Sequence, residues 1–284
     1  CVYLPTNLVD KRLLPREENI PDESGATETN SSDARKTILI AEDNEEFRQF
    51  MYQQLSQEYQ VWEASNGEEA EAIANEKEVD IIVSDVMMPG MDGFELCLRL
   101  KENMKTSHIF IILLTARTGD ENELAGYQSG ADCYLTKPFN MDILKNRIQH
   151  LLALQQKRKQ IFLSGIEVNA EDLTSSKVDE RFLQKAIELV EKNLDNSDYS
   201  VEAFSDDMCM SRMNLYRKLQ IITGQKPTEF IRSIRLKKAA GLLTHTELTV
   251  IEISEKVGFA TPSYFSKCFK DMFGVLPTQY HSQD

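Results

Sequence analysis

Side chains that could carry chemistry lie where predicted strands end, in the first half of the chain. An apolar run, residues 81–83, lies within an expected strand over residues 79–84; Asp85 follows that strand, and turn residues come at once after it. A short apolar run bounded by turn residues is typical of a buried strand. Another such run, residues 37–41, ends at Glu42 and Asp43. If these strands are neighbours in a parallel sheet, the carboxylates meet at the edge where ligands collect in open α/β sheets.

Carboxylates placed this close repel one another and raise one another's pKa. A divalent cation relieves that repulsion, and a set of oxygen ligands suits Mg²⁺. In isolation Asp85 could simply cap the following turn. Its neighbours at the strand ends favour a nucleophile that attacks a phosphoryl group, with Mg²⁺ held by Asp43 and Asp85 and, through water, by Glu42.

Two more polar side chains follow strands to the same edge. Thr115 ends the run at residues 109–114, and Lys137 follows the run at residues 133–135. A hydroxyl and an amine are suited to binding phosphoryl oxygens. Phosphatases of the haloacid-dehalogenase type need a second Asp two residues after the nucleophile. Met87 occupies that position, which argues strongly against this class of enzyme. The chain also lacks a GxxxxGK[ST] loop, which excludes a P-loop NTPase.

Strand and helix patterns alternate along residues 36–150, which predicts a doubly wound, five-stranded parallel sheet with helices on both faces. The expected strands are residues 37–41, 59–63, 79–84, 109–114 and 133–135. The expected helices are residues 44–57, 67–75, 93–103, 120–129 and a long helix from Met141 to about Gln160. Residues 161–177 read as an irregular connector.

From Val178 onward only helical periodicity remains, so we expect a second domain that is all α. Its expected helices are residues 179–194, 201–208, 211–222, 227–244, 249–257 and 262–272. The net charge of −14 is unevenly divided. Residues 209–284 hold eleven Lys/Arg and six Asp/Glu, a net charge of +5 that leaves −19 for the other 208 residues. This asymmetry favours an acidic regulatory half and a basic half that binds a polyanion.

Residues 37–155 resemble the receiver domain of bacterial response regulators, through LIAEDN (39–44), DVMMPGMDG (85–93), LLTA (113–116) and YLTKPF (134–139). The resemblance implies a flavodoxin-like sheet in the order 2-1-3-4-5 and phosphorylation of Asp85 from the phosphohistidine of a histidine kinase. It also implies a cis bond before Pro138 and movement of Thr115 toward the phosphate. It implies that Asp43, Asp85 and the Met87 backbone carbonyl bind Mg²⁺, with Glu42 in the outer position. It implies that Lys137 and Thr115 bind the phosphate and that Tyr134 is the aromatic switch.

Two segments of the helical half, residues 201–222 and 250–273, read as helix-turn-helix units. In each, the second helix opens on a good N-cap, Ser211 or Thr261. Residues 200–281 resemble AraC-type transcription regulators, through SRMNLYRKL, TGQKPTEFIRSIRLKKAAGLL, VGFATPSYFSKCFKDMFG and PTQY. Cys209 departs from that pattern, because a Gly is common in the first turn.

The AraC-type resemblance implies two recognition helices in successive major-groove segments of DNA, about 34 Å apart. The residues expected to face DNA are Arg212, Met213, Tyr216 and Arg217 from the first helix, and Thr261, Pro262, Ser263, Ser266 and Lys267 from the second. A helix bundle whose charged faces are merely solvated is the alternative on charge alone.

The combination resembles the C-terminal part of a hybrid two-component system, in which kinase, receiver and DNA-binding domain share a polypeptide. We expect the end of a preceding kinase domain plus a linker over 1–35, the receiver over 36–155, a connector over 156–177 and the AraC-type domain over 178–284. The expected partners are promoter half-sites, an intramolecular phosphohistidine and a second copy of the chain. We expect this segment to lie in the cytoplasm without touching the membrane, although a sensor part that precedes it could tether it there.

Two alternatives stay open. The chain could be a stand-alone response regulator whose first 35 residues are a tail. It could also be a phosphorelay protein whose helical domain binds protein, which the +5 charge and the paired helix-turn-helix units disfavour.

Overall fold

The computed structural model describes residues 35–116, 130–164, 170–174 and 176–280. The predicted N-terminal segment up to Ala34 and the predicted helix over 120–129 lie outside these residues, as do residues 165–169 and 175 of the predicted connector. Among the described helices, none combines the length and apolar character needed to cross a membrane.

The first half folds around a parallel sheet of five strands in the order β2-β1-β3-β4-β5, as predicted. The strands are β1 (Thr37–Ala41), β2 (Gln60–Ala64), β3 (Ile81–Asp85), β4 (Phe110–Thr115) and β5 (Cys133–Thr136). Ala41 pairs with Ser84, and Asp85 pairs with Leu114. Glu42 and Asp43, which follow β1, therefore reach the same edge as Asp85.

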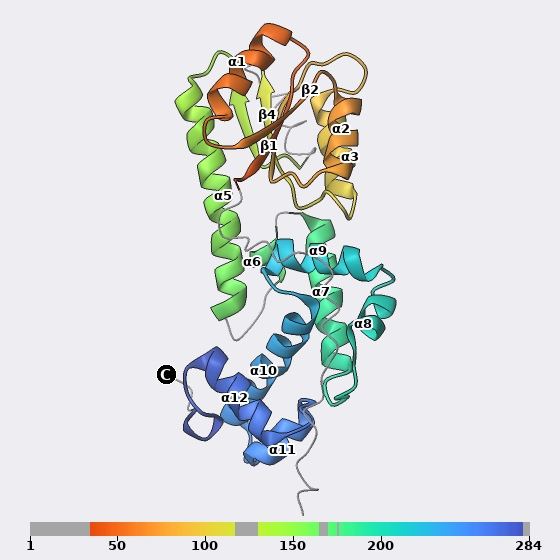
Figure 1. Ribbon diagram of the computed structural model, residues 1–284, viewed down its shortest axis with the longest axis vertical. Helices are drawn as coiled ribbons and strands as arrows, with labels where there is room; N and C mark the ends of the chain where they lie inside the picture. The colour runs from red at the N-terminus through yellow and green to blue at the C-terminus, as the bar shows by residue number, and fades with distance from the viewer. Residues whose placement is uncertain (1–34, 117–129, 165–169, 175, 281–284) are drawn as a thin grey trace, which may run out of the picture. The chain divides into compact units, whose positions relative to one another are not determined.

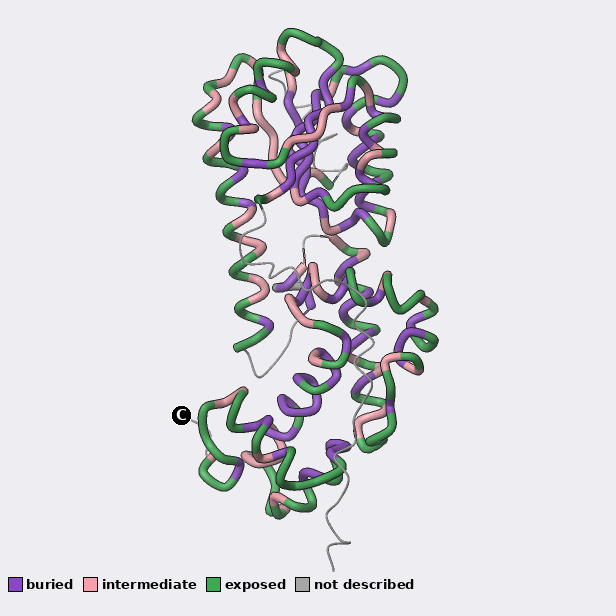
Figure 2. The backbone as a smooth tube through the Cα atoms, viewed as in Figure 1, coloured by how far each residue is buried: buried purple, intermediate pink, exposed green. Residues whose placement is uncertain are grey.

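Helices cover both faces of the sheet (Figure 1). One apolar core lies between the sheet and α2 (Gly67–Glu76) and α3 (Gly93–Glu102), and another between the sheet and α1 (Glu45–Leu55) and α5 (Met141–Ser164). Every residue of β1 and β3 is buried between these layers (Figure 2). Continuous burial explains why both strands read as unbroken apolar runs instead of alternating ones.

Helices in this half begin where a polar side chain caps the first turn. The side chains of Asn44, Asn66 and Asp92 accept hydrogen bonds from backbone N–H groups at the starts of α1, α2 and α3. Such caps satisfy N–H groups that have no partner within the helix. The cap at Asp92 also ends the loop that leaves Asp85, so α3 starts beside the acidic edge.

The second half is helical, with a short 3₁₀ turn at Pro277–Gln279. Its helices are α6 (Ala170–Leu173), α7 (Lys177–Lys192), α8 (Val201–Asp207), α9 (Arg212–Thr223), α10 (Pro227–His245), α11 (Val250–Lys256) and α12 (Pro262–Phe273). The first part of α10 packs into a core with α7, α8 and α9, and its second part packs into another core with α11 and α12. One helix therefore joins two small helical units.

Helix α5 runs to Ser164, beyond the end expected near Gln160, and α6 lies where irregular chain was expected. The polar run of residues 155–160 suggested a helix that frays into solvent. The structure instead buries Phe162, whose ring stacks on Phe230 of α10 with centroids 5.6 Å apart. Burial of this ring favours continuing the helix, because most helical stability in proteins comes from packing.

Phe230 is the centre of this packing, since its ring also stacks on Phe204 of α8 at 6.0 Å and the residue is fully buried. We predict that Phe230→Ala lowers the free energy of unfolding by about 3–5 kcal/mol, because it removes a buried aromatic ring and leaves a cavity. Chemical denaturation of the full chain measures this. Ile161→Ala, at an exposed position of α5, is the matched control and should cost less than about 1 kcal/mol. Equal losses in the two variants would contradict the prediction.

Candidate functional site: an acidic sheet edge and two helix-turn-helix units

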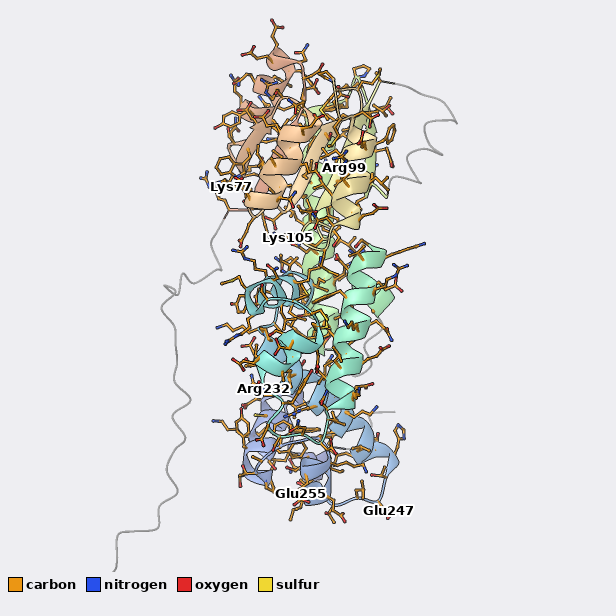
Figure 3. All side chains as sticks on the ribbon, turned by 90° about the vertical axis from the view of Figure 1, so that its right-hand side faces the viewer. Lys77, Arg99, Lys105, Arg232, Glu247 and Glu255 are labelled. Atoms are coloured by element: carbon orange, nitrogen blue, oxygen red, sulfur yellow. The ribbon has the colours of Figure 1, made fainter. Side chains whose placement is uncertain are left out.

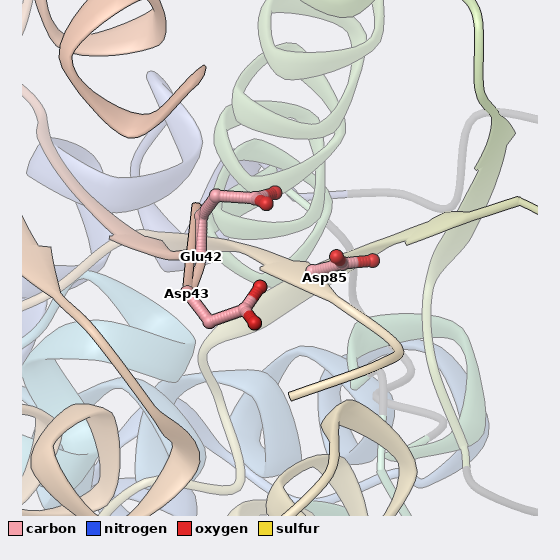
Figure 4. Close-up of side chains that lie close together, drawn as sticks. All are labelled: Glu42, Asp43 and Asp85. Atoms are coloured by element: carbon pink, nitrogen blue, oxygen red, sulfur yellow. The ribbon is translucent and has the colours of Figure 1, made fainter. Parts of the chain in front are cut away.

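Three carboxylates meet at the end of β1 and β3, as the sequence predicted. Glu42, Asp43 and Asp85 each offer a ligand oxygen, and these oxygens all lie within 4.8 Å of one another (Figure 4). Glu42 and Asp85 are buried, whereas Asp43 is exposed. Buried and exposed oxygens this close form a donor set that suits a hard divalent cation with part of its water shell retained.

Lys137 compensates part of the negative charge. Its Nζ lies 2.8 Å from Glu42 Oε2 and 2.9 Å from Asp85 Oδ2. Burial lowers the pKa of Lys137, but its hydrogen bonds to Glu42 and Asp85 outweigh that effect and raise it overall. Burial raises the pKa of Glu42, and the nearby Asp85 charge adds to this, while Lys137 opposes it. The lysine is therefore charged and bridges two of the carboxylates.

The remaining receiver residues predicted from sequence lie around this edge. Thr115 is half-buried at the end of β4, and its carbonyl accepts a hydrogen bond of 2.7 Å from the Lys137 backbone N–H. The bond between Lys137 and Pro138 is cis, as predicted. Tyr134 in β5 is half-buried and packs against the core under α2 and α3. Met87 is exposed in the loop after β3.

The loop after β3 is held by contacts that sequence reasoning missed. Glu68 of α2 accepts a hydrogen bond of 3.0 Å from the Met91 backbone N–H. Gly93 packs so closely that an added Cβ would lie 2.3 Å from the Asp85 carbonyl oxygen. At the end of β1, the Arg48 guanidinium likewise donates to the Glu42 carbonyl at 2.7 Å. An exposed-looking Glu and Arg on helix surfaces carry no signal of such roles in a single sequence.

The two helix-turn-helix units use the same turn. In the first, Cys209 N–H donates to Asp206 O and Met210 N–H donates to Ser205 O, at 2.9 and 3.0 Å. In the second, Gly258 N–H donates to Glu255 O and Phe259 N–H donates to Ser254 O, both at 3.0 Å. Cys209 has φ of 56° and Gly258 has φ of 75°, so both are left-handed. The first turn thus keeps its geometry although Cys209 replaces the usual Gly.

The residues predicted to face DNA are mostly exposed on α9 and α12. Arg212, Met213, Tyr216 and Arg217 are all exposed, and Arg212 pairs with Glu202 at 2.6 Å. In the second unit Thr261, Pro262, Ser263 and Lys267 are exposed, whereas Ser266 is half-buried and donates to the Pro262 carbonyl at 2.9 Å. Thr261 caps α12 by accepting from the Tyr264 N–H. Tyr264, which sequence reasoning did not select, is 49% exposed beside these residues and accepts from Arg232, labelled in Figure 3.

A buried arginine links the two units. Arg235 of α10 donates to the Gly258 carbonyl at 2.9 Å and to the Asn196 carbonyl at 2.5 Å. Gly258 lies in the turn of the second unit, and Asn196 precedes α8 of the first. A Cβ on Gly258 would lie 2.3 Å from the Leu194 carbonyl oxygen. Arg235 and this close approach therefore set how α8–α9 and α11–α12 are placed about α10.

Comparisons with known proteins find a family match in the sheet-containing half of the chain and another in the helical half. Residues 38–149 match the response regulator receiver domain family, and residues 204–283 match a helix-turn-helix domain family. Histidine kinase P4 of Formosa agariphila is 39% identical over 268 residues, covering 94% of this chain and 20% of the relative. Transcriptional regulatory protein AfsQ1 of Streptomyces coelicolor is 38% identical over 117 residues, covering 41% of this chain and 51% of the relative. The solved structure of chemotaxis protein CheY4 of Vibrio cholerae is 34% identical and has a TM-score of 0.40, covering 42% of this chain and 99% of that one.

The fold and the site thus combine a receiver-type sheet with an acidic edge and a domain of two helix-turn-helix units. The chain carries a response regulator receiver domain over residues 38–149, followed by an AraC-type helix-turn-helix domain over residues 204–283. Its likeness to a histidine kinase over nearly its whole length fits a hybrid system. The chain spans between about a fifth and a half of the length of these curated relatives.

Cys209 has a left-handed backbone conformation, which should lower the stability of the protein. A non-glycine residue there costs roughly 1–2 kcal/mol, partly offset by the greater flexibility of glycine in the unfolded chain. We therefore expect Cys209→Gly to raise the free energy of unfolding by about 0.5–1 kcal/mol. Thermal denaturation measures it, with Gly258→Ala as the opposite control, which should destabilise. A lower melting temperature for Cys209→Gly would show that the thiol contributes more than the backbone strain.

Proposed function

We propose that this chain is a sequence-specific transcription regulator whose DNA binding is controlled by phosphorylation of Asp85. The observation that carries the proposal is the cluster of Glu42, Asp43 and Asp85 with Lys137 bridging two of its members. An acidic cluster that keeps one compensating amine is suited to receiving a phosphoryl group, since the amine can pair with the incoming oxygens.

The reaction is a transfer between two groups. An Asp85 carboxylate oxygen attacks the phosphorus of a phosphohistidine, the P–N bond breaks, and the imidazole nitrogen leaves with the bonding electrons. The product is an acyl phosphate on Asp85. The donor we propose is a histidine kinase in the same polypeptide, supported by the likeness of this chain to part of a longer histidine kinase.

We propose that Asp43 and Asp85, with the Met87 backbone carbonyl, would hold Mg²⁺ and that Glu42 would contact it through water. Mg²⁺ bound there would neutralise charge that develops on the phosphoryl oxygens. Lys137 and the Thr115 hydroxyl would bind those oxygens. The half-buried Tyr134, next to β4 in the sheet, is the proposed aromatic switch.

Phosphorylation adds about −1.5 to −2 charge at Asp85. We propose that this favours pairing of two chains, so that their DNA-binding domains occupy repeated half-sites. On each chain Arg212, Met213, Tyr216 and Arg217 would enter one major-groove segment. Thr261, Pro262, Ser263, Ser266 and Lys267 would enter the next. The exposure of these side chains, apart from the half-buried Ser266, supports this assignment, and α10 with Arg235 lies between the two units.

Asp85 can be tested as the phosphoacceptor with acetyl phosphate and Mg²⁺. We expect Asp85→Asn to abolish incorporation of label, because the attacking oxygen is replaced by an amide. Asp43→Asn should shift the Mg²⁺ concentration needed for labelling upward. Asp142→Asn, an exposed acid at the start of α5, is the matched control and should label like the parent. Parental labelling of Asp85→Asn would refute the assignment.

The recognition helices can be tested with a DNA fragment enriched from a random pool by the parent chain. We expect Arg217→Ala and Lys267→Ala each to weaken binding by about 1–3 kcal/mol if they contact base edges, and to flatten the salt dependence by about one unit if they contact phosphate. Arg181→Ala, on an exposed face of α7, is the control and should change neither. Salt-independent binding, or no enrichment of any DNA, would favour the alternative of a helical domain that binds protein.

A further inference from the structure

One turn of the receiver domain touches the first helix-turn-helix unit through polar groups. This turn, residues 103–109, joins α3 to β4 and lies at the edge of the sheet opposite Asp85, because β4 begins at Phe110 and ends at Thr115. Ser107 in the turn is completely buried although its side chain is polar. A buried hydroxyl needs partners, and here they come from α7 and α9.

Lys218 of α9 is the centre of the contact. It is 3% exposed, and its Nζ lies 2.5 Å from Asp179 Oδ1, 2.7 Å from Ser107 Oγ and 2.6 Å from the Met104 carbonyl oxygen. These partners use all three ammonium hydrogens. Ser107 Oγ in turn donates to Asp179 Oδ1 at 2.6 Å. Burial lowers the pKa of Lys218, while the charge and hydrogen bond of Asp179 oppose that effect.

The ion pair lies wholly within the helical domain, since Lys218 is on α9 and Asp179 is on α7. The receiver adds only the Ser107 hydroxyl and the Met104 carbonyl. If the turn moved away, both charges would keep each other and regain water. A buried ion pair contributes little net stability, because the cost of removing the charges from water offsets their attraction. The contact between the receiver turn and the Lys218–Asp179 pair is therefore specific in its geometry, and we expect it to open at little cost in free energy.

The same junction is imperfectly closed. A cavity of about 20 Å³, the size of one water, is lined by residues of the turn, α5, α7 and α9. His108 faces it, and the buried His108 Nδ1 has no hydrogen-bond partner among the described residues. A buried polar atom without a partner costs free energy that opening of the junction would recover.

Helix α5 provides the second attachment between the domains, and it is of a different kind. Phe162 near its end is buried in the core of the first helical unit, and Lys237 of α10 donates to the Phe162 carbonyl. The packing of the Phe162 ring is apolar and is continuous with the receiver's own helix. The helical domain would thus stay joined through α5 if the turn released Lys218.

We propose that the Lys218–Asp179–Ser107 network restrains the first recognition helix in the unphosphorylated chain, and that phosphorylation releases it through a shift of β4. In the structure the network is closed while Asp85 pairs with Lys137. β4 carries Thr115 at the phosphorylation edge and leads back to Ser107 at the other. The inference rests on the proposed control of DNA binding by Asp85.

The test is a substitution on the receiver side, which leaves the Lys218–Asp179 pair intact. Ser107→Arg places a bulky cation at a fully buried position next to the Lys218 charge, so it should open the contact. DNA affinity is measured for the full chain with and without beryllofluoride and Mg²⁺, on the fragment enriched by the parent. In the parent we expect beryllofluoride to strengthen binding by roughly 5- to 150-fold, the usual range of coupling between sites.

In Ser107→Arg we expect the untreated chain to bind DNA as tightly as the beryllofluoride-treated parent does. The ratio of its DNA affinities with and without beryllofluoride should therefore be near one. Lys105→Gln, on the same turn but exposed and labelled in Figure 3, should keep the parental ratio. Ser107→Ala, which removes only the hydroxyl, should reduce the ratio and keeps the test decisive if the arginine variant does not fold.

A parental ratio in both Ser107 variants would overturn the inference and leave the proposed function standing. A ratio of one in the parent itself would overturn the proposed function. Hydrogen exchange separates these outcomes without DNA: beryllofluoride should speed exchange of the amides of residues 104–108 in the parent. Unchanged exchange there would also overturn the inference.

Discussion

Repulsion among three carboxylates at one sheet edge is the constraint on which the rest of the molecule depends. Parallel pairing of β1 with β3 brings Glu42, Asp43 and Asp85 together, and two of them are buried. Such a cluster is unfavourable without compensation. Lys137 supplies one positive charge from the end of β5, which leaves the site acidic enough for a cation and provides an amine for an anion. Because β5 runs parallel to β4 and ends at the same edge of the sheet, Lys137 follows it to the carboxylates.

The two halves are joined by contacts of contrasting chemistry. Phe162 continues the hydrophobic core of the helical half into α5, so that attachment is apolar and hard to break without exposing aromatic surface. The turn before β4 contributes hydrogen bonds to a buried ion pair whose members can each be rehydrated. Under the regulation that we propose, the apolar attachment keeps the domains joined while the polar contact opens.

Within the helical half the same turn occurs twice with different residues. Gly258 is required by its positive φ and by the approach of the Leu194 carbonyl, whereas Cys209 adopts the same conformation at an exposed position. Arg235 is buried and, among the described residues, its guanidinium donates to two backbone carbonyls. Burying a charge in this way is costly. Its position between the two units indicates that geometry, more than stability, accounts for it.

Much of the fold and of the acidic site could be predicted from the sequence by itself. Apolar runs that end in Glu42, Asp43, Asp85 and Thr115 predicted the strands and the residues at their ends, because strand period and chain direction are local properties. The order of the strands followed from the resemblance to receiver domains. Only the tertiary structure decided that α5 continues to Ser164, that Glu68 and Arg48 hold the site, and that Lys218 joins Asp179 and Ser107. Each of these depends on segments far apart in sequence becoming neighbours, and a lysine on a helix has the same local pattern whether it faces water or a buried carboxylate.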